Sequence, residues 1–342
     1  MCMNLLRKMD RNKVQFDFVK HTAAVGEYEE EIISLGGRIF EAPRYKIVNH
    51  SSYKRWWKRF LTTHNEYQII HGHYFTISAI YLSVAHKLNL TTIGHVHAMS
   101  FVGNINHIVG DVFVHAISGV TDYRFACSKA AGKWAYRDKK FTVLKNAVDT
   151  KRFAFDQQRR ASMRAQLGVG QDETLFCVVA NLSEVKNPIG TIDIFKAIRG
   201  KLPAAKLIWA GEGSMHAQLD EKIKAENLSD SAMLLGARSD IPDILQAADV
   251  FMLCSFSEGL GLAAIEAQAA GLPCLLSTGV PKEADIASLC TFLRLDDAKA
   301  WVEAAEQACR IERKDTREAI IASGYDVQQT ADWLTEFYLN CK

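Results

Sequence analysis

Short apolar runs alternate with helix-forming stretches along most of the chain. The second half shows this most clearly, because apolar segments at 174–180, 206–210 and 250–254 are each followed by a loop and then a helical stretch. Unbroken apolar runs of about four to eight residues are typical of parallel strands that are buried on both faces. The pattern therefore predicts an α/β protein in which parallel strands alternate with covering helices.

One of these units, residues 249–281, carries the clearest chemistry. The apolar run 250–254 predicts a buried strand, and residues 262–270 are rich in helix-forming side chains. Gly271 and Pro273 then end the predicted helix. The turn between strand and helix contains an acidic residue and two glycines: Glu258, Gly259, Leu260 and Gly261.

A glycine turn that leads into a helix is suited to an anion. The first N–H groups of the helix are unpaired, and the helix dipole adds partial positive charge. Gly259 and Gly261 allow a ligand to approach the backbone closely. Glu258 and Glu266 are poor phosphate ligands but good acceptors for sugar hydroxyls, so the pattern fits a nucleotide-diphosphate sugar. An ordinary buried βαβ unit with one surface and one capping glutamate would explain the same residues.

Two pairs of histidines end successive predicted strands. His71 and His73 close the run 69–73, and His95 and His97 close the run 91–97. Ligands of open α/β sheets bind beyond the carboxyl ends of the strands, so we expect these side chains near a ligand. A zinc site needs three or four converging ligands, and no carboxylate or cysteine partner is evident, so no metal is predicted. A single core histidine is the alternative for His71.

Composition bounds the possibilities without changing the fold class. The 342 residues are enough for two domains, and 48% hydrophobic with 23% charged residues is a globular composition. The eight cysteines are scattered without a Cys-x-x-Cys spacing, which favours reduced thiols over a disulfide framework or zinc site. No apolar run has the length of a membrane span or signal peptide, so we expect a cytoplasmic protein.

The net charge of +2 conceals an asymmetry. Residues 1–150 contain 20 basic and 12 acidic side chains, whereas residues 151–342 contain 21 and 27. Part of the excess lies in the amphipathic stretch 53–64, where Tyr and Trp residues share one helical face and four basic residues the other. This stretch predicts either peripheral contact with an anionic membrane or a helix that packs its aromatic face on the sheet. The basic residues are Lys54, Arg55, Lys58 and Arg59.

The spacing of Glu258 and Glu266 forms a Glu-x7-Glu pattern, which resembles that of the retaining glycosyltransferases of family 4. The strings at 266–274 and 280–286 are similar to the bacterial capsular and exopolysaccharide branch of that family. The resemblance implies the GT-B fold, in which two doubly wound Rossmann-like domains face a cleft. In such enzymes a strand and glycine loop precede the first helix, whereas this sequence begins within the predicted helix, so we expect either that the true start lies upstream or that the strand and loop are missing.

The resemblance also implies a domain organisation. Residues 146–153 are similar to the hinge between the two domains, which places an acceptor-side domain at 1–148. A nucleotide-sugar-binding domain would follow at 149–324. Residues 325–342 would form a last helix that crosses back to the first domain.

The family pattern assigns roles to individual residues of this chain. His97 would face the reaction centre, Glu258 would bind the donor hexose, and Glu266 would bind the ribose. Lys186 would hold the diphosphate, together with the turn 259–261 and without a metal or other cofactor. Where related enzymes carry an arginine, this chain has Asn181, and Arg238 is the candidate to supply the missing charge.

The function implied is transfer of a hexosyl unit, with retention, from a nucleotide-diphosphate sugar to a saccharide or lipid-linked acceptor in cell-surface polysaccharide synthesis. Asn181 and the short N-terminus leave open a degenerate, non-catalytic member of the family. A nicotinamide-dependent oxidoreductase is a further alternative, because residues 259–264 mimic a dinucleotide fingerprint. That motif requires an acidic residue after the next strand, where Ser277 and Thr278 stand. No feature indicates a nucleic-acid partner.

Overall fold

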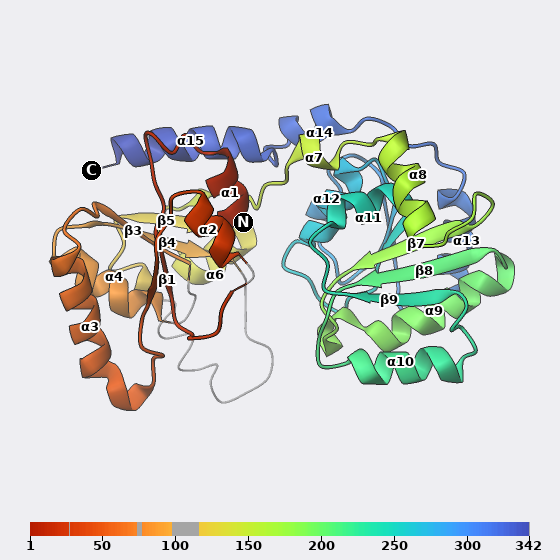
Figure 1. Ribbon diagram of the computed structural model, residues 1–342, viewed down its shortest axis with the longest axis horizontal. Helices are drawn as coiled ribbons and strands as arrows, with labels where there is room; N and C mark the ends of the chain where they lie inside the picture. The colour runs from red at the N-terminus through yellow and green to blue at the C-terminus, as the bar shows by residue number, and fades with distance from the viewer. Residues whose placement is uncertain (27, 74–76, 98–115, 342) are drawn as a thin grey trace. The chain divides into compact units, whose positions relative to one another are not determined.

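The computed structural model describes residues 1–26, 28–73, 77–97 and 116–341. The chain divides into two compact units (Figure 1). The first comprises Met1–Ala147 and Val327–Lys342, and the second comprises Val148–Asp326. Each unit has its own parallel sheet and its own hydrophobic core.

The described residues of the first unit form two parallel sheets. A two-stranded sheet pairs β1 (Phe18–Lys20) with β2 (Ile39–Glu41). The larger sheet has the order β3-β4-β5-β6, formed by Ile69–Gly72, Thr91–Val96, Tyr123–Ala126 and Thr142–Val143. Helices of this unit within the described ranges are α1 (Cys2–Lys8), α2 (Glu29–Ser34), η1 (Ile47–Asn49), α3 (His50–Thr63), α4 (Ser78–Lys87), α6 (Lys129–Tyr136) and α15 (Val327–Asn340).

Successive residues of the central strands face opposite sides of the larger sheet, as the two-residue period of a strand requires. On one side Ile93 and Phe125 pack with Tyr338 of α15. On the other side Val96 and Ala126 pack with side chains of α3, α4 and α6. Helix α15, the last of the chain, therefore covers one face of the first unit's sheet (Figure 1).

Helix α3 accounts for the amphipathic pattern of residues 53–64. Trp57 is 3% exposed, and Tyr53, Phe60 and Leu61 are buried in the same core. Trp56 is partly buried and stacks on Phe60 with ring centroids 5.1 Å apart. The structure thus corrects the aromatic half of the membrane interpretation: burying these large rings on the sheet removes them from water, and from any bilayer. No helix in the described ranges is long and apolar enough to cross a membrane.

The second unit has one parallel sheet in the order β12-β11-β10-β7-β8-β9. In chain order these strands are β7 (Thr174–Val179), β8 (Ala205–Ala210), β9 (Ala232–Gly236), β10 (Val250–Leu253), β11 (Cys274–Ser277) and β12 (Cys290–Leu293). The helices are α7 (Thr150–Phe153), α8 (Gln157–Gln166), η2 (Glu184–Lys186), α9 (Pro188–Lys201), α10 (His216–Ala225), α11 (Ile241–Ala247), α12 (Leu262–Ala269), η3 (Lys282–Ala284), α13 (Ala298–Ala308) and α14 (Arg317–Ala322).

Helices cover both faces of this sheet (Figure 1). Leu175 and Phe251 belong to a core cluster with α11 and α12. Their neighbours Phe176 and Met252 point the other way, into a cluster with α9, α10 and α13. The strands are therefore buried on both sides, which is why they appear in the sequence as unbroken apolar runs.

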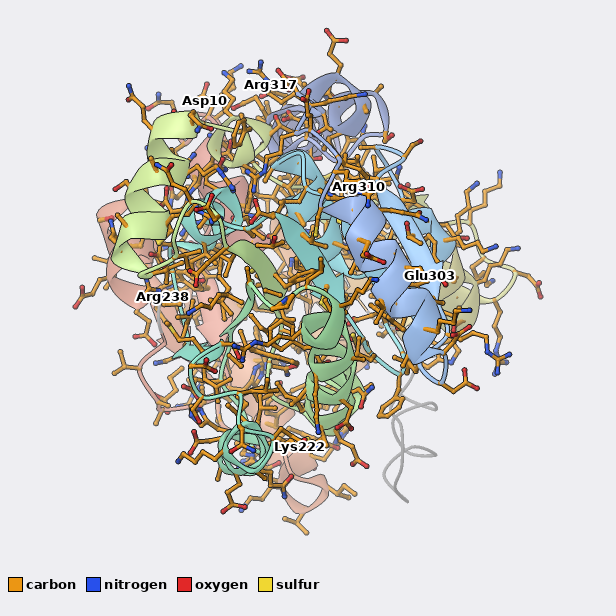
Figure 2. The ribbon with its side chains drawn as sticks, turned by 90° about the vertical axis from the view of Figure 1, so that its right-hand side faces the viewer. Asp10, Lys222, Arg238, Glu303, Arg310 and Arg317 are labelled. Carbon is orange, nitrogen blue, oxygen red and sulfur yellow. The ribbon has the colours of Figure 1, made fainter. Side chains whose placement is uncertain are left out.

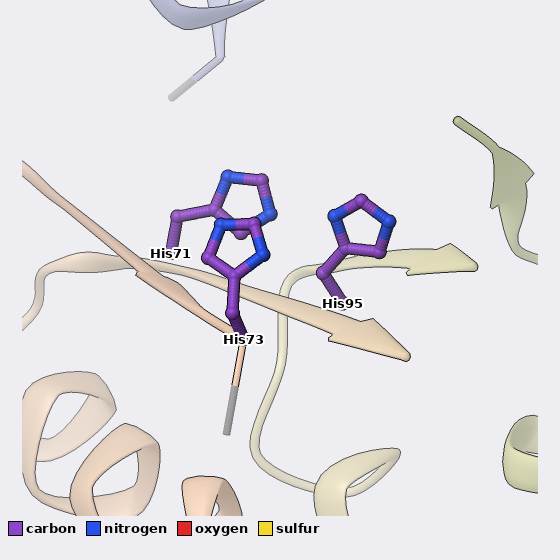
Figure 3. Close-up of side chains that lie close together, drawn as sticks. All are labelled: His71, His73 and His95. Carbon is purple, nitrogen blue, oxygen red and sulfur yellow. The ribbon is translucent and has the colours of Figure 1, made fainter. Parts of the chain in front are cut away.

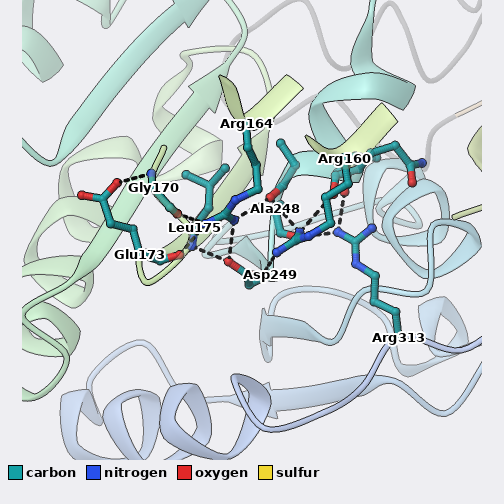
Figure 4. Close-up of polar contacts among 11 residues, drawn as sticks. Arg160, Arg164, Gly170, Glu173, Leu175, Ala248, Asp249 and Arg313 are labelled. Carbon is teal, nitrogen blue, oxygen red and sulfur yellow. Dashed lines mark hydrogen bonds and ion pairs between the residues drawn. The ribbon is translucent and has the colours of Figure 1, made fainter. Parts of the chain in front are cut away.

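A charged network fixes the start of β10 (Figure 4). One oxygen of Asp249 accepts a hydrogen bond from Arg160 at 2.5 Å. The other accepts from Arg164 at 3.1 Å and from the backbone N–H of Leu175 at 2.7 Å. Arg313 also donates to the carbonyl of Ala248. The network ties α8 and the segment before α14 to the junction of β7 and β10.

Candidate functional site

Strands β7 and β10 are neighbours in the second unit's sheet, and the chain proceeds outward from them in opposite directions. Such a reversal is the topological switch point at which open α/β sheets bind ligands. The loops that follow these strands, residues 180–187 and 254–261, therefore leave the sheet side by side. They are joined where the N–H of Phe256 donates to the carbonyl of Val185 at 2.8 Å.

The two loops share an ion pair between two predicted site residues. Lys186 donates to both carboxylate oxygens of Glu258, at 2.7 and 2.8 Å. The hydroxyl of Ser255 donates to the same carboxylate at 2.6 Å. The Glu258 side chain is only 9% exposed and that of Lys186 is 22% exposed. Because an ammonium group has three donors, Lys186 keeps one for a further acceptor such as a phosphate oxygen.

The turn after Glu258 has the backbone of a ligand-binding loop. Gly261 caps the start of α12 with φ +77°, a left-handed conformation that favours glycine. A side chain at Gly259 would meet no atom within 4 Å, so the backbone there is open to a ligand. Leu260 is different, since its side chain is buried in the core and anchors the turn. Leu260 can therefore contact a bound nucleotide sugar only through its backbone.

Glu266 lies on α12 and is half-buried. Burial raises its pKa to about 7, although the nearby Arg152 acts in the opposite direction. Its carboxylate has no hydrogen bond or ion pair to another side chain in the part of the chain that the structure describes. A half-buried acceptor of this kind is suited to a hydroxyl donor on a ligand.

Asn181 and Arg238, two further residues predicted to bind the donor, follow strands β7 and β9 of the second unit. Asn181 is exposed, and its side-chain oxygen accepts a hydrogen bond from Ser183 at 3.2 Å. Arg238, labelled in Figure 2, follows β9 and forms a two-pronged ion pair with Asp240 at 2.8 and 2.6 Å. Three of the five guanidinium N–H donors remain available beyond this pair, so the role of Arg238 in donor binding stays a prediction.

The predicted histidine of the reaction centre lies in the first unit. His97 follows β4, and one of its ring nitrogens is 2.9 Å from a ring nitrogen of His73. Burial, with the neighbouring His73, lowers the pKa of His97 to about 3, so the imidazole is neutral at physiological pH. His71 and His95 are stacked beside this pair.

The second unit thus brings together Lys186, Glu258 and the glycine turn, with Glu266 on the helix that follows. Two residues were missed by the sequence interpretation. Ser255 lies three residues before Glu258, so its place in the same turn was a usable signal. Arg152 comes from α7, more than 100 residues earlier, and nothing in the sequence links it to Glu266.

Comparison with known proteins agrees with this geometry. The family model "Glycosyl transferases group 1" matches residues 159–326. The chain is 29% identical to the putative glycosyltransferase EpsF of Bacillus subtilis (strain 168), over 99% of this chain and 92% of that one. It is also 29% identical to the UDP-Gal:alpha-D-GlcNAc-diphosphoundecaprenol alpha-1,3-galactosyltransferase of Escherichia coli, over 59% of this chain and 54% of that one.

Solved structures show the same architecture. The crystal structure of Anabaena Alr3699/HepE in complex with UDP and glucose has a TM-score of 0.76, with 16% identity, over 95% of this chain and 99% of that one. A sucrose-phosphate synthase from Thermosynechococcus elongatus has a TM-score of 0.73, with 17% identity, over 94% and 98%. At such low identities the likeness is one of fold.

Proposed function

Because the chain belongs to the group 1 glycosyltransferases and has the GT-B fold, we propose that it transfers a hexosyl unit, with retention, from a nucleotide-diphosphate sugar. The observation that carries this proposal is the meeting of Lys186 and Glu258 at the switch point of the second unit. A cation for the diphosphate and a carboxylate for sugar hydroxyls are held in contact there, beside the glycine turn that begins α12.

The diphosphate of the donor would be bound by backbone N–H groups and by a positively charged side chain. The start of α12 and the backbone of residues 259–261 offer N–H groups to the diphosphate. Lys186 adds a full positive charge, which stabilises the negative charge that develops on the leaving diphosphate. Helix dipole and lysine together take the place that a metal ion fills in other nucleotide-sugar enzymes, so no cofactor enters this step.

The two glutamates would orient the sugar rings. Glu266 would accept hydrogen bonds from the ribose hydroxyls. Glu258 would contact the donor hexose, and Lys186 would then exchange part of its contact with Glu258 for the phosphate. Asn181 leaves the diphosphate with one positive charge fewer, which lowers the expected donor affinity by about tenfold to a hundredfold.

The acceptor would be met by the first unit, whose basic excess suits an anionic molecule. A saccharide or a lipid-linked acceptor is the class we propose, supported by the diphosphoundecaprenol in the name of the E. coli relative. A lipid-linked acceptor also fits a cytoplasmic protein held peripherally at the membrane. His97 would lie at the reaction centre as a neutral hydrogen-bonding group.

Calorimetric titration of the full chain with UDP, a UDP-hexose and NAD tests the proposal against its rivals. We expect one binding site per chain for UDP and for the UDP-hexose, and none for NAD. Binding of NAD alone would favour the oxidoreductase. Absence of any binding would favour a non-catalytic protein, which the missing arginine at position 181 makes the stronger rival.

A further inference from the structure

Two histidine pairs converge at the carboxyl ends of β3 and β4. The strands are parallel, with His71 opposite Ile93 and Gly72 opposite Gly94, so His73 continues to the level of His95. Side chains two residues apart point to the same face of a strand. The rings therefore gather on one face of the first unit's sheet, the face covered by α15, as Figure 3 shows for three of them.

The nitrogen atoms of this cluster are close together and incompletely paired. One ring nitrogen each from His71, His73 and His95 lie within 4.8 Å of one another. His95 is 2% exposed, and neither of its ring nitrogens makes a hydrogen bond of ordinary length and angle among the described residues, although the Leu144 backbone acts on the ring. Within the same ranges, Nε2 of His71 makes no such bond either. Each unpaired buried polar atom costs about 1–3 kcal/mol, so the fold retains them against a penalty.

We propose that His71, His73 and His95 form a binding site for a divalent transition-metal ion, with zinc as the first candidate. Neutral imidazole is a ligand for zinc, copper, iron and nickel, and three histidines with an open fourth position are a known zinc arrangement. The ion would accept lone pairs that otherwise remain unsatisfied. The sequence predicted no metal because three or four converging ligands could not be identified; the register of β3 with β4 brings three histidines to one place.

Two neighbours orient the ligand rings. Nδ1 of His71 lies 2.5 Å from the hydroxyl of Tyr338 on α15, and Nδ1 of His73 lies 2.9 Å from Nε2 of His97. A hydrogen bond at one ring nitrogen sets the tautomer and leaves the opposite nitrogen for the metal, as partners of metal-bound histidines commonly do. Tyr338 and His97 are therefore positioning residues.

Binding requires a small movement of the rings. In a tetrahedral site with Zn–N distances of about 2.0–2.1 Å, the nitrogens lie about 3.4 Å apart. His71 and His73 are stacked with ring centroids 4.2 Å apart, and rotation of the rings would bring their nitrogens to a common point. The bound ion would join β3 to β4 and, through Tyr338, to α15. This site lies in the first unit and is independent of the diphosphate site proposed in the second.

The proposal is tested by measuring how much metal is bound by the full chain, produced without a polyhistidine tag. The protein is stripped with chelator, dialysed against zinc at low concentration, and analysed for bound metal; a competing chromophoric chelator gives the Kd. Cobalt provides a second readout, because a tetrahedral site gives an intense visible absorption band. We expect one zinc per chain and a tetrahedral cobalt spectrum.

Variants of the three ligands identify the site. His71→Gln, His73→Gln and His95→Gln should each weaken zinc binding about 100-fold or more, and Tyr338→Phe about tenfold. His86→Gln is the matched control, because His86 lies exposed on α4 of the same unit and should leave zinc binding unchanged. Circular dichroism confirms that each variant is folded. UDP titration, which reports on the second unit, should be unaffected by metal removal.

Three outcomes would overturn the proposal. They are uptake of well under one zinc per chain by the unaltered protein, a cobalt spectrum without tetrahedral intensity, or equal loss of zinc in His86→Gln and the ligand variants. The first two use the unaltered chain, so they decide the matter even where the buried His95→Gln fails to fold. If the unaltered chain binds UDP but no metal, the proposed donor site is supported and the proposed metal site is refuted.

Discussion

Replacing Lys186 by methionine tests how the donor loops are held together. The ammonium group donates to both oxygens of Glu258, whose side chain is 9% exposed. Without it, the carboxylate keeps only the hydroxyl of Ser255 among the side chains that the structure places around it. An uncompensated charge in a fully buried pair costs about 3–5 kcal/mol. Because Lys186 is 22% exposed and water can replace part of its contact, we expect about 2 kcal/mol of lost stability.

A double-mutant cycle isolates the pair from other effects of the substitution. Glu258→Gln removes the other charge, and the double variant removes both. We expect the double variant to be more stable than the sum of the single losses predicts, with a coupling of about 1–2 kcal/mol in urea unfolding followed by tryptophan fluorescence. Additive losses, with coupling under about 0.5 kcal/mol, would refute the reasoning.

Lys222→Met is the matched control for this cycle. Lys222 has almost the same exposure, 24%, and also contacts two carboxylates, those of Asp193 and Glu226, each at 2.7 Å. It lies at the surface, where it is labelled in Figure 2, and surface pairs contribute little because solvent screens them. We expect a loss below about 1 kcal/mol.

The same variants separate stability from ligand binding. Lys186→Met should weaken UDP binding about tenfold to a hundredfold, as expected for one charged hydrogen bond. Glu258→Gln should retain or tighten UDP binding, since it releases the ammonium group and UDP has no hexose for Glu258 to contact. Equal UDP affinity in Lys186→Met and the unaltered chain, measured by calorimetry, would show that this lysine does not hold the diphosphate.

Four further predictions concern single features. Glu266→Ala should weaken UDP binding by about 1.5–3 kcal/mol without unfolding the chain. Because burial raises the pKa of Glu266 to about 7, affinity of the unaltered chain should decline as pH falls through that value and the carboxylate takes up a proton. The alanine variant should show only the smaller decline that protonation of the UDP phosphate causes near pH ~6; unchanged affinity in the folded variant would rule out the ribose role. Asn181→Arg should raise UDP affinity about tenfold, since arginine matches phosphate oxygens with a planar fork; a level or lower affinity would mean that this loop does not clamp the diphosphate. The chain should sediment with anionic vesicles at low salt through the basic face of α3, at about 1 kcal/mol per charge; equal sedimentation after replacing the four basic residues with glutamine, or none by the unaltered chain, would end the membrane hypothesis. Asp249→Asn should lower the free energy of unfolding by about 2–3 kcal/mol, because Arg160 and Arg164 lose their counter-charge; Asp240→Asn, in the exposed pair with Arg238, is its control, and a similar loss in both would contradict the argument.

Local patterns predicted the architecture of the second unit well. The apolar run at 250–254 and the helix expected at 262–270 correspond to β10 (Val250–Leu253) and α12 (Leu262–Ala269). Such elements are visible in a sequence because buried strands need continuous apolar residues and helices need good helix formers. The glycine turn could also be predicted from the sequence, because a backbone φ of +77°, as at Gly261, favours glycine.

Long-range contacts were beyond the reach of those patterns. Lys186 and Glu258 are 72 residues apart, and only the strand order brings their loops together. The aromatic face of α3 has the same sequence pattern whether it packs on a sheet or on a membrane, so the sequence alone does not distinguish the two. The two histidine pairs likewise converge only through the register of β3 with β4, which the spacing within each strand does not specify.

The stereochemistry of the product tests the central claim most directly. The chain is incubated with a panel of UDP-hexoses of α configuration and saccharide or lipid-linked acceptors, and the new glycosidic bond is examined by NMR. We predict release of UDP and a product in which the hexose keeps the α configuration, with both slowed in Glu266→Ala at a donor concentration that does not saturate the variant. A β-linked product would contradict retention, and failure of every donor to release UDP, although UDP binds, would contradict the assignment of this chain as an active hexosyltransferase.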